Sequence, residues 1–209
     1  EDRVVEYLVQ VLVDHHVETM FEGVHQLLPA HYAVVDRSGL TQLPYWRVPE
    51  GQNKLTLAEA SEQLLDLLRS AVSLRLRSDV PIGSLLSGGL DSTTVVCIVR
   101  QLLDAQQATN SFDFFSAVFE EEAYSERRYV EETARQTGMP VHWIYPRPER
   151  LPEALHDILY YQEFPFRSLS VYSQWEIMRF VRQTPNVVLL NGQGSDEIFA
   201  GYTADHHAL

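Results

Sequence analysis

Lysine is almost absent from this chain, because Lys54 is the only one among 209 residues. The 16 basic side chains are outnumbered by 29 acidic ones, which gives a net charge of -13. Non-specific nucleic-acid binding depends on Lys and Arg that neutralise phosphates, so we expect no nucleic-acid partner. A polyphosphate site in this chain must therefore use backbone amides, hydroxyls, arginines and a metal held by carboxylates.

Cysteine and long apolar runs are also scarce. Cys97 is the single cysteine, so no internal disulfide can form, and in TTVVCIV a free thiol usually packs as a small apolar side chain. No run of about 18 apolar residues occurs, and the opening EDRVVEY lacks the pattern of a signal peptide. We expect a soluble, cytoplasmic protein without a membrane partner. Since the chain begins at Glu1 and stops soon after Tyr202, we also expect a fragment of something longer.

The pattern of apolar residues predicts an α/β protein. Residues 31–47 read as two strands around a DRSG turn, and Thr56 with Glu59 forms a T-x-x-E capping box before an amphipathic helix at roughly 57–76. Apolar strands then alternate with helices up to NVVLLNGQGSDE, which predicts a parallel sheet with helices on both faces. Ligands bind beyond the carboxyl ends of such strands, here expected at about 82–86 and 187–190.

The turn Ser87-Gly88-Gly89-Leu90-Asp91-Ser92 follows the first of these strands and precedes an apolar helix. Its two glycines let successive amides point at one anion, and the helix adds free amides and its positive dipole end. Ser87, Ser92 and Thr93 offer hydroxyl donors. Because no lysine follows the glycines, this is not the common P-loop. Asp91 instead suits a magnesium ion bound to pyrophosphate.

SGGLDS resembles the signature of the N-type ATP pyrophosphatases, the PP-loop family. A second string, Asn191-Gly192-Gln193-Gly194-Ser195-Asp196-Glu197 continuing to Gly201-Tyr202, resembles the second ATP motif of glutamine-dependent asparagine synthetases. FEGVHQLLPAHYAVVD and EFPFRSLSVYSQW are also similar to stretches of that family. The fold implied is a Rossmann-like doubly wound parallel sheet of the adenine nucleotide alpha hydrolase type. Residues 1–50 would be the end of a glutaminase-like domain and the junction, and residues 51–209 the first half of the synthetase domain.

The resemblance also implies a site. ATP and its pyrophosphate would lie on Leu85, Ser87, Gly88, Gly89, Leu90, Asp91, Ser92, Ala117, Val118 and Gly192. The substrate would contact Gly194, Ser195 and Tyr202, the catalytic candidates would be Asp91, Gln193 and Asp196, and Mg²⁺ would be held by Asp91 and Asp196. If their strands are neighbours, the two aspartates face each other across the metal.

The reaction implied is adenylation of a carboxylate, the aspartate side chain in asparagine synthetases, followed by attack of ammonia channelled from a glutaminase domain. A homodimer is the assembly to test. The chain departs from the family in having Asn191 and Gln193 where many members carry Ser and Glu, and an amide cannot act as a base. Relatives that cyclise a β-lactam or a macrolactam through an internal amine, and a non-catalytic ATP-binding module, stay open as alternatives. Other PP-loop enzymes fit SGGLDS but not the second string.

Several remaining features are expected to be structural. Adjacent side chains of a helix or strand point different ways, so we expect no metal at His15-His16 or His206-His207. The acidic run Glu120-Glu121-Glu122 reads as a solvated loop that could reach the rim of the ATP site. The aromatic side chains of the 160–175 region could line a substrate channel, but such stripes more often pack in the core, which is what we expect of Tyr160, Tyr161, Phe164, Phe166, Tyr172 and Trp175.

Overall fold

The computed structural model describes residues 2–13, 15–51, 54–105, 112–119 and 126–202. They form two compact units. The larger one comprises residues 55–155 and 169–209, and the smaller one comprises residues 1–54 and 156–168. The acidic run 120–122 and the pair His206-His207 lie outside the described residues.

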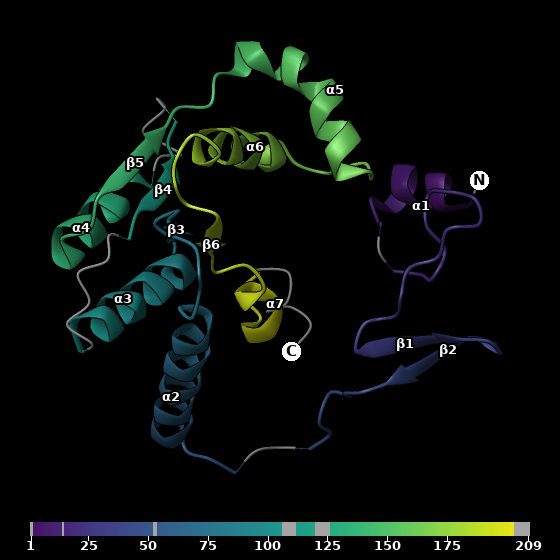
Figure 1. Ribbon diagram of the computed structural model, residues 1–209, viewed down its shortest axis with the longest axis horizontal. Coiled ribbons are helices and arrows are strands. Elements are labelled where there is room, and N and C mark those ends of the chain that lie inside the picture. Colours follow the sequence, from purple (N-terminus) through teal and green to yellow (C-terminus); the bar gives the residue numbers. More distant parts are fainter. Residues whose placement is uncertain (1, 14, 52–53, 106–111, 120–125, 203–209) are drawn as a thin grey trace. The chain divides into compact units, whose positions relative to one another are not determined.

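A four-stranded parallel sheet forms the centre of the larger unit, in the order β5-β4-β3-β6 (Figure 1). The strands are β3 (Ile82–Leu85), β4 (Phe114–Ala117), β5 (Val141–Ile144) and β6 (Val188–Leu190). The chain moves outward from β3 to β5 and then returns to the other side of β3. The strand order thus reverses between β3 and β6.

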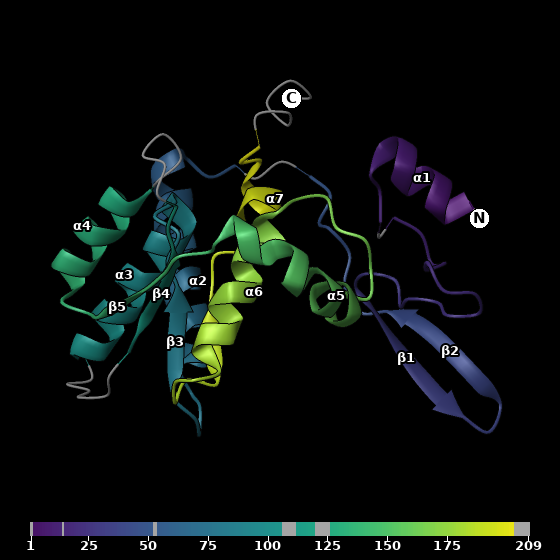
Figure 2. The ribbon, with the colours of Figure 1, turned by 90° about the horizontal axis from the view of Figure 1, so that it is seen from above.

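Helices cover both faces of this sheet (Figure 2). One face carries α2 (Leu57–Arg75), α3 (Leu90–Ala105) and α4 (Arg127–Thr137), and the other carries α6 (Ser170–Val181), which packs on β4 and β5. The predicted doubly wound α/β arrangement is therefore confirmed.

Two apolar cores follow from the alternation of side chains along β4. Phe114 is fully buried in the core that contains Val96 and Val99 of α3, whereas the next residue, Phe115, is fully buried against Ile177 and Val181 of α6. Since neighbouring residues of one strand serve opposite cores, the strand is fixed from both faces. Its carboxyl end is thereby held in place for the site above it.

The capping box before α2 is present as predicted. The Thr56 hydroxyl accepts a hydrogen bond from the Glu59 amide at 3.3 Å, and the Glu59 carboxylate accepts one from the Thr56 amide at 2.8 Å. That second bond is the main reason why the pKa of Glu59 lies below its usual value. Two amides at the helix start gain partners in this way.

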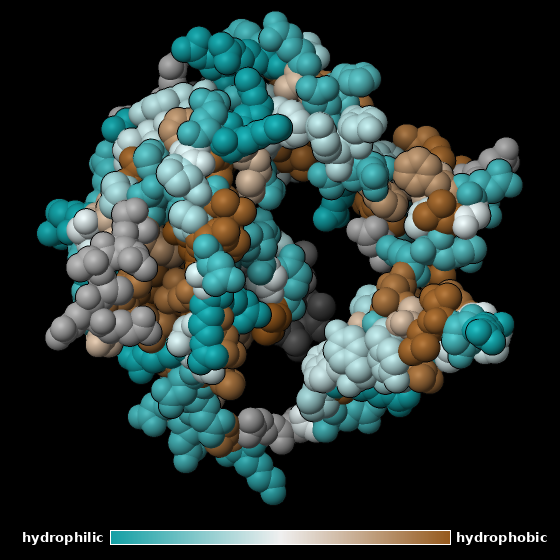
Figure 3. Space-filling model, in the orientation of Figure 1, coloured by the Kyte–Doolittle hydropathy of each residue, from teal (hydrophilic) through white to brown (hydrophobic). Residues whose placement is uncertain are grey.

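The smaller unit contains α1 (Asp2–Gln10) and a hairpin of β1 (His31–Asp36) and β2 (Gly39–Pro44), which confirms the two expected strands. It also holds the later part of α5 (Leu151–Gln162), which follows the short η2 helix (Pro148–Arg150) in the chain. Many apolar side chains of α1 are exposed, among them Leu8 at 72% and Val9 at 73%, and apolar residues appear in brown on the surface of this segment (Figure 3).

Two sequence-based expectations about side chains are wrong. Tyr160 and Tyr161 are 71% and 70% exposed rather than in the core, because both belong to the part of α5 that lies in the smaller unit. His15 and His16 do not diverge, because they lie in a bend rather than in a helix or strand. Their ring centroids are 4.3 Å apart, and both rings face the carboxylate of Glu6.

Candidate active site

The two glycine-rich turns are neighbours at the carboxyl edge of the sheet. Strand β3 pairs with β6, with Ser84 opposite Leu190, so the turns that follow the two strands leave the sheet side by side. The Ser84 hydroxyl, which is fully buried, donates to the Leu190 carbonyl at 3.0 Å and ties the ends of the strands together. This edge is the point where the strand order reverses, where open α/β sheets bind their ligands.

The first turn is braced by its own serines. The Ser92 hydroxyl accepts from the Ser87 amide at 3.3 Å, lies 3.1 Å from the Ser87 hydroxyl and donates to the Gly89 carbonyl at 3.2 Å. The Gly89 amide donates to the Ser87 hydroxyl at 3.3 Å. Ser92 is buried. Its hydroxyl therefore shapes the turn, in addition to lining the site that sequence analysis predicted for it.

Position 88 imposes two requirements that only a glycine can meet. Its φ is +97°, a conformation that side chains with a Cβ rarely adopt. An added Cβ would also come within 2.9 Å of the Glu126 carbonyl oxygen, at the start of α4. The first turn can thus lie against α4 only with glycine here.

The second turn is held against the first through Gly192. A Cβ at Gly192 would lie 2.8 Å from the Asp91 Cβ and 2.9 Å from the Ser92 amide nitrogen, so the two motifs touch without room for a side chain. The Gln193 amide donates to the Asn191 side-chain oxygen at 3.1 Å. Gly194, at φ +93°, is the N-cap of the short helix α7 (Ser195–Phe199).

Both turns open into one cleft of about 790 Å³ in the larger unit. The predicted site residues that line it are Leu85, Ser87, Gly89, Asp91, Ser92, Ala117, Val118, Gly192, Gln193, Gly194 and Asp196. They come from the ends of β3, β4 and β6 and the starts of α3 and α7. Residues about 100 positions apart in the chain thus contribute to one concave surface.

The other predicted residues lie elsewhere. Gly88 and Leu90 line a separate groove of about 360 Å³ between α3 and α4, together with Thr93. The Thr93 hydroxyl is buried and, among the described residues, has no hydrogen-bond partner, so it is not one of the donors around the cleft. Ser195 and Tyr202 are not among the lining residues of the cleft.

Sequence reasoning missed most of the apolar wall of the cleft, because it considered only Tyr172 of this wall as a possible lining residue and favoured a core position for it. Phe115, Ile177 and Tyr172 lie along it, with Pro146, Pro148, Leu151 and Leu169 from the segments around α5. Tyr172 is only 4% exposed, and its hydroxyl donates to the Arg147 carbonyl at 2.7 Å. Burial is the main reason why the pKa of Tyr172 is raised. An aromatic residue in a helix carries no sequence signal that separates a cleft wall from an ordinary core position.

The cleft is acidic. Its described lining includes Asp91, Glu126, Asp196 and Glu197, and no Lys, Arg or His among the described residues. Within the described chain, no hydrogen bond or ion pair occupies the side-chain carboxylates of Asp91 and Asp196. Two unpaired carboxylates beside the amide-rich start of α3 are a donor set that fits a divalent cation carrying phosphate oxygens.

Glu197, at the edge of the second motif, has a hydrogen-bond partner. The Tyr202 hydroxyl donates to the Glu197 carboxylate at 2.8 Å, and this bond is the main reason why the pKa of Glu197 lies below its usual value. Tyr202 therefore reaches the cleft indirectly, through a carboxylate that lines it.

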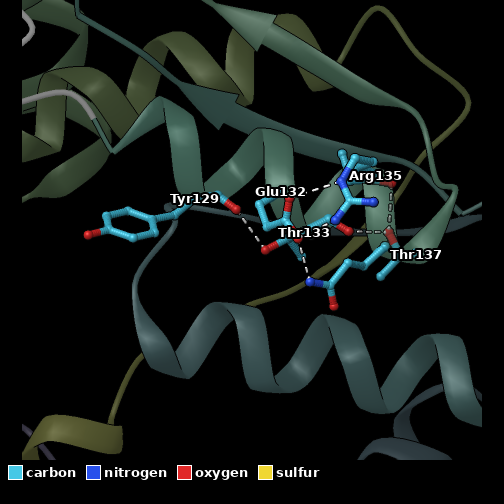
Figure 4. A network of polar contacts seen from close by, with 7 residues as sticks. Tyr129, Glu132, Thr133, Arg135 and Thr137 are labelled. Carbon is cyan, nitrogen blue, oxygen red and sulfur yellow. Dashed lines mark hydrogen bonds and ion pairs between the residues drawn. The ribbon is translucent and has the colours of Figure 1, made fainter.

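Helix α4, which supports Gly88, carries its own network of side-chain contacts (Figure 4). The Glu132 carboxylate accepts from the Arg135 guanidinium at 2.9 Å and from the Gln136 amide at 2.6 Å. These bonds, the one from Arg135 first, lower the pKa of Glu132 to about 2. The Thr133 hydroxyl donates to the Tyr129 carbonyl at 2.8 Å. All of these contacts join residues of α4 to one another.

Comparison with known proteins identifies the family. The asparagine synthase family matches residues 63–209. The chain belongs to this family. Amidase chyE of Penicillium rubens is 30% identical over 201 residues, which cover 89% of this chain and 30% of that protein. Asparagine synthetase [glutamine-hydrolyzing] 1 of Bacillus subtilis is 30% identical over 141 residues, which cover 68% of this chain and 21% of that protein. The chain therefore spans a third or less of the length of these relatives.

Among solved structures, the NH3-dependent NAD synthetase from Campylobacter jejuni is similar to this asparagine synthase family member at a TM-score of 0.42 and 12% identity, covering 71% of this chain and 61% of that one.

Among the described residues, none of the helices has the length and apolar character needed to cross a membrane.

Proposed function

We propose that this chain forms the nucleotide-binding part of an ATP-dependent ligase, which activates a carboxylate as an acyl-adenylate and transfers the acyl group to ammonia. The observation that carries the proposal is the contact of the two glycine-rich turns at the β3–β6 switch point, where Gly192 touches Asp91. One turn alone could bind an anion. Two turns that share a cleft with an apolar wall can hold a triphosphate and an adenine ring together.

In the first step of the proposed reaction, an oxygen of the substrate carboxylate attacks the α-phosphorus of ATP, and the bond to the β-phosphate breaks. Pyrophosphate leaves with both electrons of that bond. Asp91 and Ser92 at the start of α3 line the cleft, and the free amides of this helix end would stabilise the charge that gathers on the leaving group. In the second step, ammonia attacks the acyl carbonyl, loses a proton and displaces AMP. Neither step needs a protein nucleophile.

The carboxylates of Asp91 and Asp196 are the residues that would hold Mg²⁺. When bound, the metal supplies neutralisation of the triphosphate charge, which this acidic cleft otherwise lacks. Both residues line the cleft, Asp91 from the first turn of α3 and Asp196 from the first turn of α7.

The adenine ring would lie between Leu85 and the Ala117–Val118 end of β4, beside the apolar wall. The Val118 amide already donates to the Ile144 carbonyl at 2.9 Å, so it belongs to the sheet and is not available to the base. Recognition there would rest on packing with Phe115 and Ile177 and on the remaining backbone groups. Gly194 and Gln193 would face the substrate. Since Gln193 is an amide, it can position the substrate but cannot accept its proton.

We further infer that the ammonia comes from glutamine through a glutaminase domain, of which residues 1–50 would be the end, and that residues 51–209 are the first half of the synthetase domain. We also propose that the substrate carboxylate is the aspartate side chain, that the protein forms a homodimer and that its location is cytoplasmic.

The test is exchange of labelled pyrophosphate into ATP, measured with aspartate and then with other carboxylates. Exchange that depends on aspartate supports asparagine synthesis. Exchange only with a carboxylate that carries its own amine, without any need for ammonia in product formation, supports the cyclising relatives. ATP binding without exchange on any carboxylate would overturn the ligase proposal in favour of a binding module.

A further inference from the structure

The smaller unit contains a cluster of three side chains of types that commonly bind metals, and none of the three belongs to the cleft. Glu6 of α1 offers a carboxylate to two imidazoles. The Nε2 atom of His15 lies 2.9 Å from one carboxylate oxygen, and the Nε2 atom of His16 lies 3.9 Å from the other. One donor atom from each residue lies within 4.8 Å of the other two. The bend at 15–16 is what turns both rings to the same side.

We propose that Glu6, His15 and His16 bind a Zn²⁺-type dication. Bond lengths of about 2.0–2.2 Å in a tetrahedral site place neighbouring donor atoms roughly 3.4 Å apart. The 2.9 Å from His15 Nε2 to its nearer Glu6 oxygen is shorter than that spacing, and one donor atom of each residue lies within 4.8 Å of the other two, so small side-chain movements suffice. Two imidazoles and one carboxylate leave a fourth position for water. Imidazole donors favour Zn²⁺ and its neighbours over Mg²⁺ and Ca²⁺, which prefer oxygen.

The cluster is oriented by partners outside it. The Arg3 guanidinium donates to the Glu6 carboxylate at 2.8 Å, on the oxygen that faces His16, and so fixes the plane of the carboxylate. Its positive charge also opposes a dication, so we expect the other oxygen, which faces His15, to be the ligand atom. The side-chain amide of Gln26 donates to the His16 carbonyl, and the Gln26 backbone amide donates to the Val17 carbonyl at 2.9 Å. The histidine segment is thus anchored at its backbone.

The position of the cluster suggests a structural role. Glu6 belongs to α1, whereas the histidines belong to the loop segment that follows it. An ion held by all three would link the helix to this segment. The side chains of His15, His16 and Glu6 are 28%, 46% and 27% exposed, so an ion can reach the cluster from solvent.

The test is titration of the protein with Zn²⁺ by calorimetry and with Co²⁺ by visible absorption, in excess Mg²⁺ so that the cleft carboxylates are occupied. We expect one ion per chain and a Co²⁺ spectrum of nitrogen and oxygen ligands in four-coordinate geometry. His15→Ala, His16→Ala and Glu6→Gln should each lower the affinity at least about tenfold. Glu6→Gln keeps the size of the side chain, and circular dichroism of each metal-free variant checks that the fold is intact.

Two control variants separate this cluster from other histidines. His156→Ala removes a side chain that is 89% exposed and should leave Zn²⁺ binding unchanged. His206→Ala with His207→Ala removes the other adjacent pair in the sequence and should also leave it unchanged. The proposal is overturned if no ion binds, if binding survives all three cluster substitutions, or if only the 206–207 pair matters. None of these results bears on the ATP cleft.

Discussion

The turns after β3 and β6 are both glycine-rich, yet they are held in different ways. The first is braced by hydrogen bonds among Ser87, Gly89 and Ser92 and lies against α4 through Gly88. The second has, among the described residues, one internal bond to a side chain, from the Gln193 amide to Asn191, and it leads into a helix of five residues. Its contact with the first turn is made through Gly192.

This difference indicates that the two turns have different roles. The first turn is pre-formed, since its own hydrogen bonds fix its backbone before a ligand arrives, and a pre-organised site needs little rearrangement on binding. The second turn depends on the first for its position. Substitutions in the first turn should therefore alter chemistry or stability directly, whereas substitutions in the second should act through its placement.

The largest expected effect comes from Asp91→Asn. The change keeps the shape of the side chain but removes one of the two unpaired carboxylates that face the cleft, so the proposed metal loses a ligand. We expect carboxylate-dependent pyrophosphate exchange to fall at least about a hundredfold. The matched control is Asp157→Asn on α5, whose side chain is 62% exposed and outside the cleft, and it should exchange at the normal rate. Equal activity of both variants would remove Asp91 from the mechanism.

Gly192→Ala tests whether the second turn depends on the first. The added methyl group would come within 3.0 Å of the backbone of α3 at Asp91 and Ser92, and backbone atoms cannot rotate away. The turn must therefore shift, and a displacement of about 1 Å can cost roughly a hundredfold in rate. We expect a loss of about ten- to a hundredfold in exchange, with thermal unfolding only modestly affected. A variant with full exchange would show that the two motifs need not touch.

Much of this site could be read from the sequence because its signals are local. Serines, glycines and an aspartate between a strand and a helix are typical of an anion site at a helix N-terminus. The neighbouring placement of β3 and β6 was an assumption in the sequence analysis, and the sheet order supplies it. The apolar wall was not predictable, because Phe115 and Tyr172 come together only through the packing of α6 on the sheet.

For the histidine pair, the sequence-based expectation was wrong. The expectation for His15 and His16 used the geometry of regular helices and strands, which does not hold in a bend. The proximity of Glu6, nine residues before His15, depends on how the chain turns after α1. Convergence of side chains through an irregular bend leaves no periodic signal in the sequence.

A smaller effect, on stability rather than chemistry, is expected from Gly88→Ala. Its φ of +97° and the Glu126 carbonyl oxygen at 2.9 Å both oppose a methyl group. We expect a loss of about 1–3 kcal/mol in the free energy of unfolding, measured by urea denaturation. The adjacent Gly89→Ala is the matched control, because its added methyl group would meet only the Ser87 hydroxyl, at 3.4 Å. Equal losses for both variants would contradict the account of Gly88.

The smallest effect is expected from Tyr202→Phe, which removes the hydrogen bond to the Glu197 carboxylate without changing the shape of the ring. Because this bond is the main cause of the lowered pKa of Glu197, the pKa should rise toward its usual value, as followed by carboxyl NMR signals. A depressed pKa in the folded state stabilises the protein above the unfolded-state value, and that stabilisation disappears as the pH falls through the folded-state pKa. The stability difference between wild type and variant should thus be present at neutral pH and vanish in acid. An unchanged pKa in the variant would mean that Tyr202 does not connect the end of the second motif to the cleft.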